Sequence, residues 1–95
     1  MAYGIVHFFP GGTKDQYEAS IAAVHPNRAT LPPGQIYHAG GPSQGGWTIV
    51  AIFDSKASWE GFRDNTLMPA LSKGVPGGFT SPPQEQAFEV ANLQT

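Results

Sequence analysis

Two histidines, His7 and His38, are the residues whose type and surroundings most strongly suggest chemistry. Histidine ordinarily titrates close to neutral pH, so it is the first side chain to consider for taking or giving a proton. Both histidines lie within apolar segments, where an imidazole costs free energy unless it is hydrogen-bonded. We therefore predict His7 and His38 as catalytic residues, on the condition that both rings face the same side of the sheet. The alternative is that each is a structural histidine bonded to neighbouring backbone or to water.

Four aromatic side chains are the candidates for ligand contacts. A cavity between helices and a sheet is a common place for a small ligand, and its walls are mainly apolar and aromatic. The predicted ligand-binding residues are Tyr37, Trp47, Trp59 and Phe62. Aromatic residues at these spacings also fill ordinary cores, so core packing remains the alternative interpretation.

The third histidine, His25, stands before Pro26 at the predicted end of a helix. A cation interacts favourably with a helix C-terminus, so we interpret His25 as a capping residue. The three histidines lack the spacing of metal ligands, and the chain has no cysteine. Haem could use one axial histidine, but nothing in the sequence selects it. We therefore expect neither a metal nor a cofactor.

Turn and capping signals divide the chain into alternating strands and helices. Thr13 and Gln16 have the spacing of a capping box, which predicts a helix that ends at His25 and Pro26, followed by a loop over 27–34. Ser55 predicts the start of a second helix that Pro69 breaks or restarts. Strands are predicted over residues 2–9, 35–40, 47–54 and 84–93. This βαββαβ order predicts one ferredoxin-like α+β domain over residues 1–95, a four-stranded antiparallel sheet with two helices on one face.

Residues 41–46, within the glycine-rich segment 40–46, join the second and third predicted strands. This segment lacks the lysine and the following helix of a phosphate-binding loop, so we interpret it as a hairpin with a loose tip.

The third predicted strand is apolar at both parities. Trp47, Ile49, Ala51 and Phe53 would face one side of the sheet, and Val50 and Ile52 the other. Two helices cover only one face of such a sheet, so the other face would expose costly apolar surface. We therefore predict a homodimer through the open sheet face; the alternatives are a large exposed apolar patch or a different covering partner.

Composition excludes several classes of function. Five Lys and Arg residues against seven Asp and Glu residues give a net charge of −2, without a basic stripe, which argues against a nucleic-acid partner. No apolar run approaches the roughly 20 residues that cross a bilayer. The apolar N-terminus lacks a cationic region and a cleavage site, so a cytoplasmic location is expected.

Residues 49–62, IVAIFDSKASWEGF, resemble the junction between the third strand and second helix of the dimeric α+β barrel superfamily. The order of elements over the whole chain is similar to that superfamily, including its antibiotic biosynthesis monooxygenase-like members. The resemblance implies activities that range from cofactor-independent oxygenation of activated aromatic compounds to isomerisation and haem chemistry. None of the catalytic side chains of the better-known members matches a numbered position here, so the resemblance assigns no site residue.

Other proteins with the same order of elements fit less well. An RNA-recognition motif needs a basic residue and exposed aromatics in its third strand, and acylphosphatases need an arginine after the first strand. Two hypotheses remain. The first is a small-molecule binding protein or enzyme, such as a cofactor-independent monooxygenase acting on a planar apolar substrate. The second is a non-catalytic dimerisation or ligand-sensing module.

Overall fold

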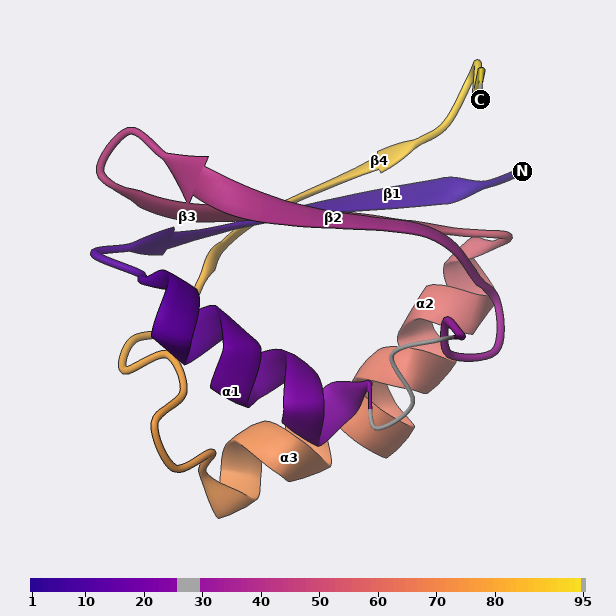
Figure 1. Ribbon diagram of the computed structural model, residues 1–95. Coiled ribbons are helices and arrows are strands. Elements are labelled where there is room, and N and C mark those ends of the chain that lie inside the picture. The colour runs from indigo at the N-terminus through magenta and orange to yellow at the C-terminus, as the bar shows by residue number, and fades with distance from the viewer. Residues whose placement is uncertain (26–29, 95) are drawn as a thin grey trace.

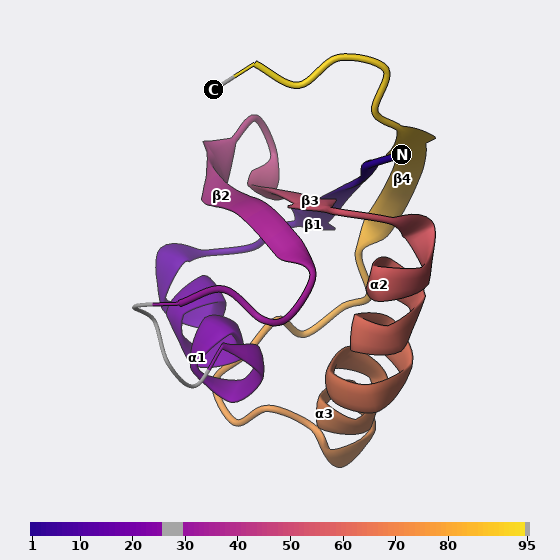
Figure 2. The same cartoon turned by 90° about the vertical axis from the view of Figure 1, so that its right-hand side faces the viewer.

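The computed structural model describes residues 1–25 and 30–94. Its elements are, in chain order, β1 (Tyr3–Pro10), α1 (Lys14–Val24), β2 (Gln35–Ser43), β3 (Gly46–Phe53), α2 (Lys56–Phe62), the π-helical turn η1 (Arg63–Leu67), α3 (Met68–Lys73) and β4 (Gln84–Glu89). The strands form one antiparallel sheet in the order β2-β3-β1-β4. Figure 1 shows the helices on one side of this sheet, and Figure 2 shows α1 and α2–α3 beneath it on opposite sides. The predicted ferredoxin-like α+β fold is confirmed.

Both predicted helix starts are confirmed. Thr13 Oγ1 accepts a hydrogen bond from Gln16 N at 3.2 Å, and Gln16 Oε1 accepts one from Thr13 N at 3.1 Å. Ser55 Oγ accepts from Ser58 N at 3.1 Å at the start of α2. Each cap satisfies backbone N–H groups that have no partner within the helix.

The helices α1 and α2 end for different reasons. The helix α1 ends at Val24, and the N–H of His25 donates to Ile21 O at 2.7 Å; Pro26 and residues 27–29 of the predicted loop lie outside the described residues. After α2 the helix widens through η1 and continues as α3, with Pro69 in its first turn. A proline has no N–H and its ring collides with the carbonyl four residues earlier in a regular helix. The π turn before it lets the helix restart as α3 at Met68, so the predicted restart near Pro69 is observed.

The hairpin between β2 and β3 is tighter than predicted. Strand pairing continues to Ser43 and Gly46, so the expected loose tip over 41–46 is wrong. Only Gln44 and Gly45 form the turn, and Gly45 has a φ of +84°, which a glycine adopts without steric cost. Pro42 is tolerated in β2 because this strand lies at the edge of the sheet.

The last strand is shorter than the predicted 84–93. Glu89 pairs with Tyr3, at the very start of β1, and Val90 N then donates to Ala2 O at 2.9 Å. Beyond this point β1 offers little further backbone with which β4 can pair.

The sheet is apolar on both faces, as the sequence indicated. Toward the helices, Ile5, Ala51, Phe53 and Trp59 form the buried core cluster. The opposite face, called here the open face, carries Val6, Phe8, Tyr37, Ala39, Val50, Ile52 and Phe88. No helix in the described part of the chain has the length and apolar character needed to span a membrane.

Candidate functional site

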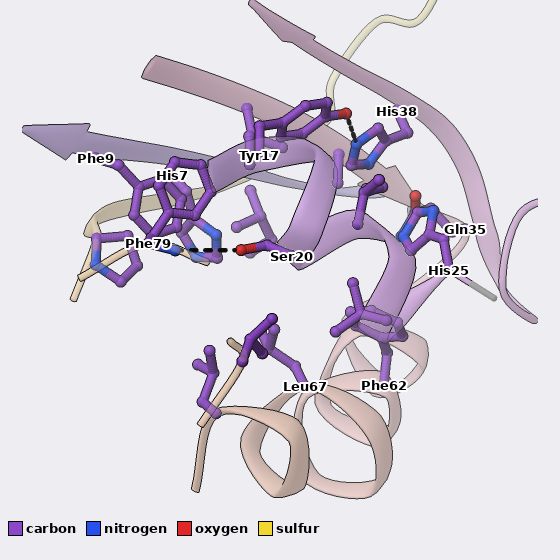
Figure 3. A pocket seen from close by; sticks show the side chains of 18 of the residues that line it. His7, Phe9, Tyr17, Ser20, His25, Gln35, His38, Phe62, Leu67 and Phe79 are labelled. Carbon is purple, nitrogen blue, oxygen red and sulfur yellow. Dashed lines mark hydrogen bonds between the residues drawn. The ribbon is translucent and has the colours of Figure 1, made fainter. Parts of the chain in front are cut away.

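A cavity of about 180 Å³ lies between the helices and the sheet face that they cover (Figure 3). Its walls come from β1, β2 and β3, from α1, from α2, η1 and α3, and from the segment 74–83 that precedes β4. Most of the wall is apolar. The polar side chains in it are His7, Tyr17, Ser20, His25, Gln35, His38 and Ser81. Such a cavity, apolar with a few polar groups, is typical of a small-molecule site.

The two predicted catalytic histidines share this cavity. In the strand register His7 lies opposite Ile49 and His38 lies opposite Ala51, two residues further along β3. Residues two apart on a strand face the same side of the sheet, so both histidines face the helices. From strand spacing and rise, their Cα atoms are about 12 Å apart. The condition set by the sequence is met, and the catalytic role of the two residues stays a prediction.

His7 forms a hydrogen-bonded pair with Glu85 across the β1–β4 ladder. The distance from Nε2 of His7 to Oε1 of Glu85 is 2.8 Å. A carboxylate only accepts hydrogen bonds, so His7 donates from Nε2 and its Nδ1 is left as the acceptor in the neutral ring. The His7 ring also packs edge-on against Phe9 and Trp59, which further restricts its orientation.

His38 is held from the helix layer by Tyr17. The Tyr17 hydroxyl lies 2.7 Å from Nε2 of His38. The Tyr17 ring stacks on Trp47 with centroids 5.1 Å apart and packs close to Gly40 of β2. The arrangement ties α1 to β2 and β3 at the end of the cavity where His38 lies.

His25 has a larger role than the capping residue predicted from the sequence. Its backbone caps α1 as expected, but its side chain is only 7% exposed and lines the cavity. The ring lies 4.8 Å from that of His38 and 6.1 Å from that of Phe62, between centroids. Tyr17, Ile21 and His25 are four residues apart along the chain, so the helix periodicity carries a signal for this position.

Gln35 is a second cavity residue that was not predicted from the sequence. The strand register shifts between Gln35 and Tyr37, so Gln35 faces Phe53 while Tyr37 faces Ile52. This β-bulge at Ile36 places Gln35 and His38 on the same face. The Gln35 side chain is 6% exposed, and its Oε1 has no hydrogen-bond partner within the described structure.

The four predicted aromatic contacts have different positions. Trp59 and Phe62 line the cavity, and Trp59 also belongs to the core cluster. Trp47 is buried but is not part of the cavity wall; it packs against Tyr17. Tyr37 is 44% exposed on the open face because of the bulge, so it does not line the cavity.

The other end of the cavity is formed by the segment 74–83. Phe79 stacks on Phe9 with ring centroids 3.7 Å apart, and its N–H donates to Ser20 Oγ at 3.4 Å. Figure 3 shows Phe79, Phe9 and His7 together, at the opposite end from His25, Gln35 and His38. An aromatic residue within a Gly- and Pro-rich segment is the one sequence signal for this contact.

Within residues 1–25 and 30–94, no three His, Cys, Asp or Glu side chains gather closely enough to hold a metal ion.

The chain matches no protein-family model and no curated protein. Three solved structures are similar to it. Rv0793 from Mycobacterium tuberculosis has a TM-score of 0.72 at 14% identity, with both chains covered completely. Two proteins carry the name "putative antibiotic biosynthesis monooxygenase". The one from Chloroflexus aurantiacus has a TM-score of 0.68 at 16% identity, covering 100% of this chain and 98% of that one.

The second protein of that name, from Bordetella bronchiseptica, has a TM-score of 0.65 at 18% identity, covering 96% of this chain and 98% of that one. Sequence identities this low show a shared fold but do not show a shared reaction. The resemblance seen in the sequence is confirmed at that level: over essentially its whole length, the chain has the fold of the antibiotic biosynthesis monooxygenase-like proteins of the dimeric α+β barrel superfamily.

Proposed function

We propose that this protein is a cofactor-independent monooxygenase that oxidises a planar apolar phenol in the cavity between helices and sheet. The observation that carries the proposal is that His7 and His38 line one apolar cavity, with His7 held by a carboxylate. A filled core, or histidines on opposite faces, would have argued against it. The name shared by two of the similar structures supports the reaction class.

In the proposed reaction Nδ1 of His7 removes the proton of the phenolic hydroxyl. The phenolate donates electrons to O₂ from a ring carbon ortho or para to its oxygen, forming a carbon–oxygen bond, and the protonated His7 returns its proton to the peroxide. Loss of the hydrogen on that carbon, with cleavage of the oxygen–oxygen bond, gives a carbonyl and water. One oxygen atom enters the ring and the other leaves as water, so the phenol supplies all the electrons.

The other residues of the site have positioning roles in this proposal. His38, held by Tyr17, contacts and orients the bound ring. Trp59 and Phe62 supply apolar contacts and keep water from the phenolate. A mainly apolar wall favours a neutral substrate on entry and strengthens electrostatic interactions inside the cavity.

We further propose that the protein is a homodimer through the open face. Val6, Phe8 and Val50 lie on neighbouring strands of this face, where no helix of the described structure covers them. Pairing two such faces removes apolar surface from water. This burial stabilises the dimer by roughly 25 cal/mol for each Å² of apolar surface. A nucleic-acid partner does not fit the net charge, and a cytoplasmic location stays a prediction.

A non-catalytic ligand-sensing or dimerisation module is the second candidate. It is favoured by Trp59, which is 4% exposed and packs in the core cluster, as a purely structural residue would. The same cavity would then bind a ligand without turning it over. Oxygen consumption separates the two functions.

The test is oxygen uptake by the purified protein with a panel of electron-rich phenols, compared with the His7→Phe variant. Phenylalanine keeps a ring beside Phe9 and Trp59 but cannot accept a proton. We expect the variant to lose about a hundredfold or more in kcat, the usual contribution of a general base. Wild-type protein that binds phenols, shown by a thermal shift, but consumes no oxygen would support the sensing module instead. Equal kcat in the variant would exclude His7 as the base.

A further inference from the structure

The buried amide of Gln35 is a polar group of the cavity to which the proposed reaction gives no role. Its Oε1 is buried and has no hydrogen-bond partner within the described structure, although the residue lines the cavity. A buried acceptor without a partner is costly, so native proteins normally satisfy one with water or with a ligand. We infer that Gln35 determines specificity, and that the ligand is a single aromatic ring with a hydroxyl at His7 and an N–H or O–H donor for Gln35 at its opposite end.

The size of the cavity matches a ligand of one aromatic ring. The volume of the cavity is about 180 Å³. An apolar cavity of about 150 Å³ in another protein binds benzene. One ring with two small substituents therefore fits, and we expect a fused second ring to fit less well.

The positions of His7 and Gln35 require that the two polar substituents lie on opposite sides of the ring. His7 lies opposite Ile49 and Gln35 opposite Phe53, so the two are at different ends of the same sheet face. Figure 3 shows this separation, with His7 near Phe79 and Gln35 near His25. Between them the part of the cavity floor that β3 forms is apolar, through Ile49 and Ala51. A ring lies over this floor while its two ends meet polar groups.

This inference rests on the proposed function for the hydroxyl at His7, and it adds the second donor and the ring size. The carbons ortho to the hydroxyl still carry hydrogen in a para-disubstituted ring, as the proposed oxygenation requires. A ligand without the second donor would displace any water at Gln35 and leave Oε1 unpaired, which lowers its affinity.

The probes are hydroquinone and p-cresol, which differ by a hydroxyl in place of a methyl group at the para position. Binding is measured by calorimetry without oxygen, so that no turnover occurs. We expect wild-type protein to bind hydroquinone about tenfold more tightly than p-cresol, the usual worth of one buried hydrogen bond. 2-Naphthol, with two fused rings, should bind at least tenfold more weakly than p-cresol.

The variant Gln35→Leu has a side chain of similar size without polar atoms, and replacing an unpaired buried amide by an apolar group should not prevent folding. It should lose the tenfold preference for hydroquinone while p-cresol binds at least as well as before. Gln44→Leu, at the exposed turn between β2 and β3, is the matched control and should keep the preference.

Equal affinities for the two probes in wild-type protein, or an unchanged preference in Gln35→Leu, would overturn the inference about Gln35. The proposed function would survive that result if His7→Phe still abolishes oxygen uptake. Tighter binding of 2-naphthol than of p-cresol would overturn the expectation of a single ring. Failure of every phenol to bind would overturn both proposals together.

Discussion

His7 and Glu85 are 78 residues apart in the chain, yet they are direct partners across the β1–β4 ladder, with 2.8 Å between Nε2 and Oε1. The Glu85 side chain is 48% exposed, whereas that of His7 is 13% exposed. A partly exposed ion pair or hydrogen bond of this kind contributes little to stability. Its consequence is the orientation of the ring, because the carboxylate accepts from Nε2 and thereby leaves Nδ1 as the proton acceptor.

The substitution Glu85→Gln tests this orientation. An amide can donate as well as accept, so it no longer selects one tautomer of His7. We expect kcat for oxygen uptake to fall about tenfold to hundredfold, smaller than the loss in His7→Phe because the base itself is retained. KM and the affinity for p-cresol should stay within about twofold, and the free energy of unfolding within about 1 kcal/mol.

Glu89→Gln is the matched control, since Glu89 is an exposed glutamate of the same strand and parity, opposite Tyr3. It should leave kcat unchanged. A Glu85→Gln enzyme with wild-type kcat would show that the carboxylate does not position His7 for the reaction.

The positions that the sequence revealed are those whose signals are local. Thr13 and Gln16 are three residues apart, and their capping box formed as predicted. The strand parity of His7 and Ile49 likewise follows from alternation along single strands. Capping and alternation depend on neighbours within a few residues, so they can be recognised without knowing the tertiary structure.

The missed residues depend on contacts between distant segments. Gln35 and Tyr37 have the same parity, and only the bulge at Ile36 sends them to opposite faces. Nothing in the local sequence specifies that bulge, so Tyr37 was expected in the cavity and Gln35 was not. Glu85 was missed because its position opposite His7 requires the register of two strands at opposite ends of the chain.

Gly40 and Gly41 provide a paired test of how α1 packs on the edge of the sheet. A Cβ added at Gly40 would lie 2.8 Å from Cζ of the Tyr17 ring, whereas one added at Gly41 would meet nothing within 4 Å. Gly40→Ala must therefore displace Tyr17 from His38 and from Trp47, and we expect it to cost about 1–3 kcal/mol in urea unfolding. Gly41→Ala should be neutral or slightly stabilising, because alanine loses less backbone entropy on folding. Equal stabilities of the two variants would contradict the close packing of Tyr17 on Gly40.

Tyr17→Phe isolates the hydroxyl from the ring. The ring contacts with Trp47 and Gly40 remain, but the 2.7 Å hydrogen bond to Nε2 of His38 is lost. We expect the free energy of unfolding to fall by about 0.5–1.5 kcal/mol in denaturant titrations. The affinity for p-cresol should fall as well, because His38 is then less firmly oriented at the cavity wall. A variant as stable as the wild type would show that this hydrogen bond contributes nothing measurable.

Val50 lies near the centre of the open face, paired with Val6 on one side and Ala39 on the other. If two copies join through this face, Val50→Lys introduces a charge into the interface of each copy, and an unpaired buried charge is strongly destabilising. We expect light scattering to give twice the mass of one chain for the wild type at micromolar concentration, and the mass of one chain for Val50→Lys. Ala57→Lys adds the same charge at an exposed position of α2, on the helix side of the sheet, and should remain dimeric. A wild-type protein that stays monomeric at these concentrations would contradict the homodimer, and a dimeric Val50→Lys protein would place the interface elsewhere.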